Sequence, residues 1–196
     1  MTTAIDSFEL VRAQAGREAT LTLNGRIGSF WGVTAEEIEA RLNEMGELDT
    51  LNVKINSRGG SAAEAIQIYS LLNDHPARVI ADVTAIAMSA ATVPLMAADE
   101  RRAAANAILM VHEASLEDAS GTADELEAQV KLLRTVNATL VTTYAARTGK
   151  PEAEIAALMK ATTYMTAQEA KDLGFLDSVT EAKQAAAAVS DVLAFV

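Results

Sequence analysis

The chain has 196 residues, of which 50% are hydrophobic and only 4% aromatic, and its formal net charge is −11. This length suits one domain with its own core, so we expect residues 1–196 to form a single domain. Such an acidic chain is a poor candidate for binding nucleic acid or an anionic membrane, because phosphate groups are bound by clustered Lys and Arg.

The chain also lacks the marks of an exported protein. It contains no cysteine, which excludes disulfides and cysteine-based metal or redox sites. The opening MTTAIDSFEL has neither the basic nor the apolar region of a signal peptide, and no apolar run reaches the roughly 18 residues of a membrane span. We therefore expect a cytoplasmic protein without a membrane segment.

Strand and helix patterns alternate over the first two thirds of the chain. Thr34 and Glu37 have the spacing of a capping box at the start of the first helix. The segment SRGGS is predicted to be a tight turn. The alternation predicts βαβ units around a mainly parallel sheet. The predicted strands are 18–28, 51–56, 78–83 and 108–112, and the predicted helices are 33–46, 62–72 and one beginning near Ser89.

A long helix is predicted over residues 122–147. Thr122 and Glu125 form a second capping box at its start. A helix of this length spans roughly 38 Å, so part of it is expected to project and pack on another subunit. Beyond it we expect a helix at 151–160, a helix that begins with a third capping box formed by Thr166 and Glu169, and a C-terminal helix at about 181–196. The apolar stripe of the long helix comprises Leu126, Val130, Leu133, Val136 or Asn137, Leu140 and Tyr144.

Ser89 lies in the apolar run VTAIAMSAATVPLMAAD, with only alanine and methionine immediately around it. It follows a predicted strand where the chain turns into a helix, and Ala87 and Ala91 leave room for a sharp nucleophile elbow. The N–H groups at the start of the helix could bind an oxyanion. The alternative is a structural serine that bonds a carbonyl one turn back.

A serine nucleophile needs a base, and His112 is the better placed of the two histidines. It ends the strand 108–112, on the edge of the sheet where Ser89 is also expected. His75 precedes a proline at a helix end and is expected to be a solvated residue. His112 could equally be an ordinary residue at a strand end.

The two glycines of NSRGGS, Gly59 and Gly60, would let the backbone approach a substrate with N–H groups turned toward an anion. By itself this pattern is weak, because turns are often rich in glycine. The sequences GxxxxGK[ST], GxGxxG and HExxH are absent, so the sequence predicts no nucleotide site, no cofactor and no catalytic zinc.

Taken together, these segments resemble the proteolytic subunit of Clp protease (ClpP), and specifically the ClpP-like head maturation proteases of phages and prophages. The resemblance extends from about Leu21 to Val179, and the order of turn, serine, histidine, long helix and TAxEAxxLGxxD makes it specific. The segments that carry it are LNGRIG, VKINSRGGSAAEAIQIYSLL, VTAIAMSAATVPLMAADE, AILMVHEAS and YMTAQEAKDLGFLDSV.

The resemblance implies an α/β fold of the ClpP/crotonase-like type, with stacked β-turn-β-α units and a projecting handle helix at 122–147. It makes Ser89 the nucleophile and His112 the general base of a serine endopeptidase that needs no cofactor. It also implies an oxyanion hole formed by the backbone N–H groups of Gly59, Gly60 and Ala90.

The resemblance further implies a homo-oligomeric ring, either a heptamer or a double ring in which handle helices meet, with peptide bonds hydrolysed inside the chamber. Capsid or scaffold proteins are the substrates that the phage branch suggests, and an ATPase unfoldase is the partner that the Clp branch suggests. The N-terminal segment, residues 1–17, corresponds to the region that contacts the unfoldase, although it contains no recognisable docking motif.

The sequence departs from the family pattern in the nucleophile segment, where SAAT replaces the usual glycine-containing motif, and at two further positions. Arg58 occupies the place of a turn proline, and Thr162 occupies the place of the triad aspartate. Three readings follow from Thr162: its hydroxyl accepts the histidine N–H bond, a carboxylate from elsewhere replaces it, or the protein is a weakened or inactive homologue with a structural role in a ring. The carboxylates considered are Glu113, Asp172 and Glu169.

Two other functions remain as alternatives. The crotonase-like fold also occurs in enzymes that bind acyl-CoA, and fold alone does not give function. A Ser–Lys dyad is a further alternative, although Lys54 lies inside a predicted strand and the other lysines come late in the chain.

Overall fold

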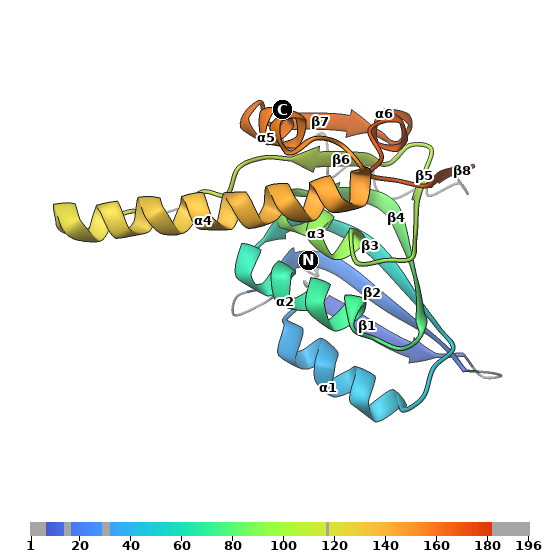
Figure 1. Cartoon of the computed structure of the whole chain (residues 1–196). Coiled ribbons are helices and arrows are strands. Elements are labelled where there is room, and N and C mark those ends of the chain that lie inside the picture. The colour runs from blue at the N-terminus through green and yellow to red at the C-terminus, as the bar shows by residue number, and fades with distance from the viewer. Residues whose placement is uncertain (1–6, 14–16, 29–31, 117, 182–196) are drawn as a thin grey trace, which may run out of the picture.

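The computed structural model describes residues 7–13, 17–28, 32–116 and 118–181. Strands from this part of the chain form one eight-stranded sheet with helices packed against it (Figure 1). The strands are β1 Ser7–Arg12, β2 Glu18–Ile27, β3 Thr50–Gly60, β4 Arg78–Met88, β5 Glu100–Ala104, β6 Ile108–Val111, β7 Thr163–Thr166 and β8 Ser178–Thr180. The helices are α1 Ala35–Met45, α2 Ala62–Asn73, the 3-10 turn η1 Ser89–Ala91, α3 Thr92–Leu95, α4 Ala123–Thr148, α5 Glu152–Lys160 and α6 Ala167–Asp172.

The centre of the sheet is parallel, as the alternation of strands and helices predicts. β2, β3 and β4 pair in parallel, and β4 pairs with β5 through its first half and with β6 through its second half. β1 and β7 are antiparallel to their neighbours β2 and β6. Because β4 and β6 run in the same direction, the residues that follow them emerge at the same edge of the sheet.

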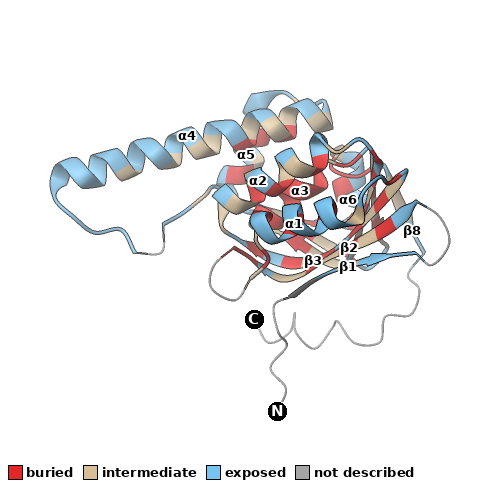
Figure 2. Cartoon of the chain, turned by 90° about the horizontal axis from the view of Figure 1, so that it is seen from below, coloured by how far each residue is buried: buried red, intermediate tan, exposed pale blue. Residues whose placement is uncertain are grey.

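The core lies between this sheet and the helices that cover it. Side chains of β2 and β3 alternate between buried and less buried, which is the period of a strand with one face in the core. Ile38 of α1 and Ile68 of α2 are completely buried against that face. Figure 2 shows the buried residues gathered on the sheet and on the inner sides of α2 and α3.

The long helix α4 leaves the body of the molecule. The predicted capping box is present, since Thr122 accepts from Glu125 N and the Glu125 side chain accepts from the Thr122 backbone. Of its apolar stripe, only Leu140 and Tyr144 are buried, whereas Leu126 is 38% and Val130 46% exposed. The first half of α4 therefore projects beyond the sheet with apolar side chains uncovered (Figures 1 and 2).

The segment around Gly174 and Asp177 is tied to β5 and α4 by Arg101 of β5. This guanidinium pairs with Asp177 at 2.6 Å and also donates to the carbonyl oxygens of Arg147 and Gly174. Burial alone would raise the pKa of Asp177, but hydrogen bonds from Arg101 and the nearby arginine charges together lower it below its usual value. A single buried cation thus joins three segments that are distant in sequence.

Two sequence predictions need correction. The segment SRGGS is not a tight turn, because β3 continues through Gly60 and stays paired with β2, although the register shifts between Asn24 and Arg26. The strands β1, β5, β7 and β8 were not predicted. The predicted C-terminal helix at about 181–196 lies, apart from its first residue, outside the described residues.

Within the described ranges, no helix has the length and apolar character needed to cross a membrane.

Candidate active site

Ser89 follows directly after β4 and opens the turn into α3. Its φ is +53°, a left-handed conformation that is uncommon for a residue with a side chain. Ala87 and Ala91 are both completely buried, so larger side chains at those positions would have no space. The turn is a sharp elbow of the kind that presents a nucleophile at the edge of a sheet.

His112 follows directly after β6, and its imidazole meets the serine. Ser89 Oγ lies 2.6 Å from His112 Nε2. The register of β4 and β6 explains this contact: Met88 pairs with Met110, so the residues that follow these two strands emerge side by side. If the histidine is neutral with its proton on Nδ1, Nε2 accepts the serine O–H, which is the arrangement that general-base catalysis requires.

The chain that leaves His112 is anchored to the long helix. The backbone N–H of Ala114 donates to Asn137 Oδ1 of α4 at 2.7 Å. This bond fixes the path of the backbone two residues beyond the histidine.

The glycine pair at the end of β3 lies against the serine elbow. A β-carbon on Gly59 would lie 2.8 Å from Ala90 N and 2.9 Å from Ser89 Cβ, so only glycine permits this close approach. The Gly59 N–H donates to Ser57 Oγ at 3.0 Å, within the last residues of β3. Gly60 is exposed whereas Gly59 is buried, so Gly60 is the glycine that faces outward.

Thr162 comes just before β7, the strand that pairs with β6. The last residues paired between β6 and β7 are Val111 and Thr163, and His112 and Thr162 are the residues next beyond that pair. Thr162 has a φ of +52° and an exposed side chain, and its N–H donates to Met159 O. The pairing of β6 with β7 thus ends one residue short of His112 and Thr162, and the described residues show no hydrogen bond between these two side chains.

The carboxylates considered from the sequence are engaged elsewhere or exposed. Glu169 Oε2 accepts from the backbone and hydroxyl of Thr166, which lowers the pKa of this carboxyl. Asp172 Oδ1 accepts from Gln168, and Glu113 is exposed. Among the described residues, no carboxylate is hydrogen-bonded to the imidazole.

The other titratable candidates lie away from the elbow. His75 Nδ1 accepts from Ala77 N at 3.1 Å, and partial burial lowers the pKa of this imidazole, so it is less solvated than expected. Lys54 pairs in register with Asp82 in the middle of β4, whereas Ser89 follows the end of that strand. This register does not favour a Ser–Lys dyad.

Two residues behind the elbow were missed by the sequence reasoning. Thr92 Oγ1 donates to the carbonyl oxygen of Ser89 at 2.6 Å and lies 2.7 Å from Tyr144 OH. Thr92 and Tyr144 are 0% and 2% exposed. The only signals in the sequence were a second hydroxyl in an apolar run and a tyrosine at the end of the α4 stripe, and nothing there connected them.

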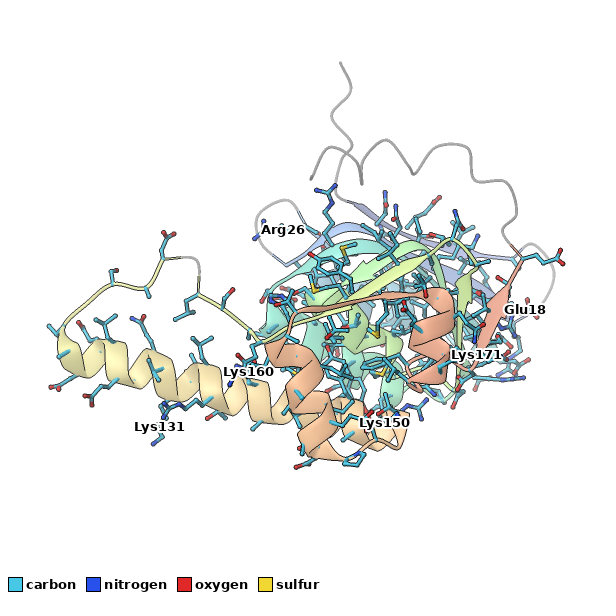
Figure 3. All side chains as sticks on the ribbon, turned by 90° about the horizontal axis from the view of Figure 1, so that it is seen from above. Glu18, Arg26, Lys131, Lys150, Lys160 and Lys171 are labelled. Atoms are coloured by element: carbon cyan, nitrogen blue, oxygen red, sulfur yellow. The ribbon has the colours of Figure 1, made fainter. Side chains whose placement is uncertain are left out.

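The edge of the sheet that carries these residues faces the long helix. Figure 3 places Arg26, near the carboxyl end of β2, on the side from which α4 extends, and Glu18, at the start of β2, on the opposite side. Because β2, β3 and β4 are parallel, the glycine pair and Ser89 share the Arg26 side. Active sites of open α/β sheets lie at such carboxyl edges.

Known proteins resemble this chain along most of its length. The family model for Clp protease matches residues 17–183. The relatives include proteolytic subunit 1 of the ATP-dependent Clp protease from Mycolicibacterium paratuberculosis, 32% identical over 160 residues that cover 79% of this chain and 76% of the relative. Proteolytic subunit 2 from Mycobacterium tuberculosis is 31% identical over 160 residues that cover 79% and 75%.

A solved structure has a similar fold. It is a variant of ClpP1 from Listeria monocytogenes in which an asparagine is replaced by aspartate, with a TM-score of 0.74 and 21% identity. The match covers 84% of this chain and 92% of the ClpP1 chain. By its family model, its relatives and its fold, this chain belongs to the Clp protease family.

Proposed function

We propose that this protein is a serine endopeptidase of the Clp type, in which Ser89 is the nucleophile and His112 the general base. The observation that carries the proposal is the 2.6 Å contact between Ser89 Oγ and His112 Nε2 at the carboxyl edge of the sheet. A serine hydroxyl is a weak nucleophile until a base takes its proton, and this contact provides that base.

The reaction follows from these positions. Ser89 Oγ attacks the carbonyl carbon of the scissile bond while its proton passes to His112 Nε2. The tetrahedral intermediate collapses as the imidazolium returns the proton to the leaving amine, and a water molecule then hydrolyses the acyl-enzyme by the same two steps. The N–H groups of Gly60 and Ala90 are proposed to hold the oxyanion, since the Gly59 N–H already donates to Ser57.

Thr162 is proposed to take the place of the triad aspartate. Its support is that His112 and Thr162 adjoin the last pair of β6 and β7, Val111 and Thr163, and the hydroxyl is proposed to accept the Nδ1–H bond. A neutral oxygen stabilises an imidazolium less than a carboxylate does, and loss of the acid costs about 10⁴-fold in turnover in a well-studied triad. We therefore propose a slow enzyme.

The biological setting is proposed from the sequence resemblance. The proposed assembly is a ring of identical subunits, either a heptamer or a double ring, in the cytoplasm. The proposed substrates are peptides or proteins, such as capsid or scaffold proteins in phage head maturation. An ATPase unfoldase is a partner in the same proposal. The apolar side chains exposed on the first half of α4, Leu126, Val130 and Leu132, support an assembly in which this helix is covered.

One observation favours a second function, that of an inactive ring component. The imidazole has no carboxylate partner among the described residues, and the third catalytic position is occupied by Thr162. This alternative predicts a stable oligomer with no serine reactivity.

Labelling with a fluorophosphonate probe, mapped by intact and peptide mass spectrometry, tests both functions. We expect an adduct at Ser89 in the wild type, none in Ser89→Ala, and faster labelling in Thr162→Asp. Unchanged labelling of Ser89→Ala would exclude the proposed nucleophile. An adduct in Thr162→Asp but not in the wild type would overturn the proposed activity and support the inactive homologue, whose oligomer is then tested by size-exclusion chromatography.

A further inference from the structure

A chain of hydroxyl groups runs from the long helix to the nucleophile elbow. Thr92 Oγ1 donates its only proton to the Ser89 carbonyl oxygen at 2.6 Å. The 2.7 Å contact with Tyr144 OH must then use the tyrosine as donor. The order of donation is therefore from Tyr144 to Thr92 to the Ser89 carbonyl.

Both hydroxyls are held where water cannot replace them. Thr92 is 0% and Tyr144 2% exposed, and the tyrosine ring packs on Phe175 with 5.6 Å between ring centroids. Burial raises the pKa of Tyr144 to about 12, so this hydroxyl keeps its proton at physiological pH and stays a donor. Removing the Thr92 hydroxyl would leave the buried Tyr144 hydroxyl without its partner.

The Ser89 carbonyl matters because of the peptide group to which it belongs. Since a peptide bond is planar and trans, the carbonyl oxygen of Ser89 and the N–H of Ala90 point in opposite directions from one plane. Thr92 holds that carbonyl with both its backbone N–H and its hydroxyl. Fixing the carbonyl toward the interior turns the Ala90 N–H the other way, toward the side where the Gly59 backbone approaches.

We propose that Thr92 and Tyr144 are positioning residues that orient the Ser89–Ala90 peptide, so that the Ala90 N–H is fixed as an oxyanion donor before substrate binds. The inference rests on the proposed function, because the hydrogen-bond chain that starts on α4 positions a peptide group of that proposed catalytic site. Oxyanion donors act on the transition state, so a loosened peptide should slow the chemical step and leave binding of the ground state unchanged.

The test compares saturation kinetics of fluorophosphonate labelling at Ser89 in three variants. Thr92→Val removes the hydroxyl at almost constant volume, Tyr144→Phe removes only the outer donor, and Thr92→Ser keeps the hydroxyl. Thr139→Val is the matched control, because Thr139 Oγ1 makes a threonine-to-carbonyl bond to Thr135 O on the exposed part of α4.

We expect Thr92→Val to lower the maximal labelling rate about tenfold, which corresponds to about 1.4 kcal/mol of barrier. Tyr144→Phe should lower it about threefold, in line with the loss of one hydrogen bond. The probe concentration giving half of the maximal rate should stay within about twofold, Thr92→Ser should restore most of the rate, and Thr139→Val should match the wild type.

Wild-type labelling with an unchanged rate in Thr92→Val would overturn the inference and leave the proposed function standing. The inference would also be overturned if the slower labelling of Thr92→Val came mainly from weaker probe binding. The same holds if Thr92→Ser does not restore the labelling rate, since a purely structural role produces either result. Absence of labelling in the wild type itself would overturn the proposed function and the inference together.

Discussion

Replacing Gly59 with alanine would push a methyl group into the elbow that carries the nucleophile. The new carbon would lie 2.6 Å from Met88 O, 2.8 Å from Ala90 N and 2.9 Å from Ser89 Cβ. Two of these atoms belong to the backbone and cannot rotate away. The end of β3 or the elbow itself must therefore move.

The cost has two parts. Gly59 has a φ of +96°, where an L-residue is strained, and a left-handed conformation costs roughly 1–2 kcal/mol. Overpacking a close contact adds roughly 1–3 kcal/mol. We expect Gly59→Ala to lower the free energy of unfolding by about 2–5 kcal/mol. A displacement of the serine approaching 1 Å should slow labelling by about 10²-fold.

Urea denaturation and fluorophosphonate labelling measure the two effects on the same samples. Gly149→Ala is the control: Gly149 has a φ of +72°, but a β-carbon there would have no neighbour within 4 Å. This variant carries the conformational cost without the collision, so it should lose only about 1–2 kcal/mol and label at the wild-type rate. The reasoning would be refuted if Gly59→Ala lost no more stability than Gly149→Ala, or if it labelled equally fast.

Two further predictions concern the supports of the site. Asp177→Asn should lower the free energy of unfolding by about 1–3 kcal/mol, because buried Arg101 loses its charged partner, whose own side chain is partly screened by solvent. Since the folded pKa of Asp177 is lowered, its contribution is complete above the unfolded value of about 3.9 and is lost as the pH falls through the folded value. Urea titrations should therefore show a weaker loss of stability below about pH 4 in the variant than in the wild type. Asn137→Leu removes the acceptor of the Ala114 N–H and should slow labelling about threefold, whereas an unchanged rate would show that this bond does not position His112.

Local signals in the sequence predicted the helices well. Thr122 and Thr166 begin their helices with complete capping boxes, as the spacing to Glu125 and Glu169 predicts. A capping box involves residues only three positions apart, within one helical turn, so it can be recognised without knowing any distant contact. The short strands were missed for the opposite reason: β7 and β8 have four and three residues, and their extended form depends on neighbours far away in the sequence.

The site was predictable only in part. The contact of Ser89 with His112 follows from two residues that end adjacent parallel strands, which alternating strand and helix patterns predict. The proposal that Thr162 takes the third catalytic position came from the family resemblance, because no local pattern predicts that β7 pairs antiparallel to β6. The bond between Thr92 and Tyr144 joins positions 52 residues apart and is visible only in the folded chain.

The left-handed conformation of Ser89 lowers the stability of the fold at the same residue that the proposed activity needs as its nucleophile. A φ of +53° is one that glycine adopts freely and that costs a residue with a β-carbon roughly 1–2 kcal/mol. Glycine there would relieve that strain and produce a chemically inert chain with a more stable fold, the trade-off found where activity needs a strained residue. Alanine keeps the β-carbon and the strain, which makes Ser89→Ala the knockout whose stability can be compared with the wild type.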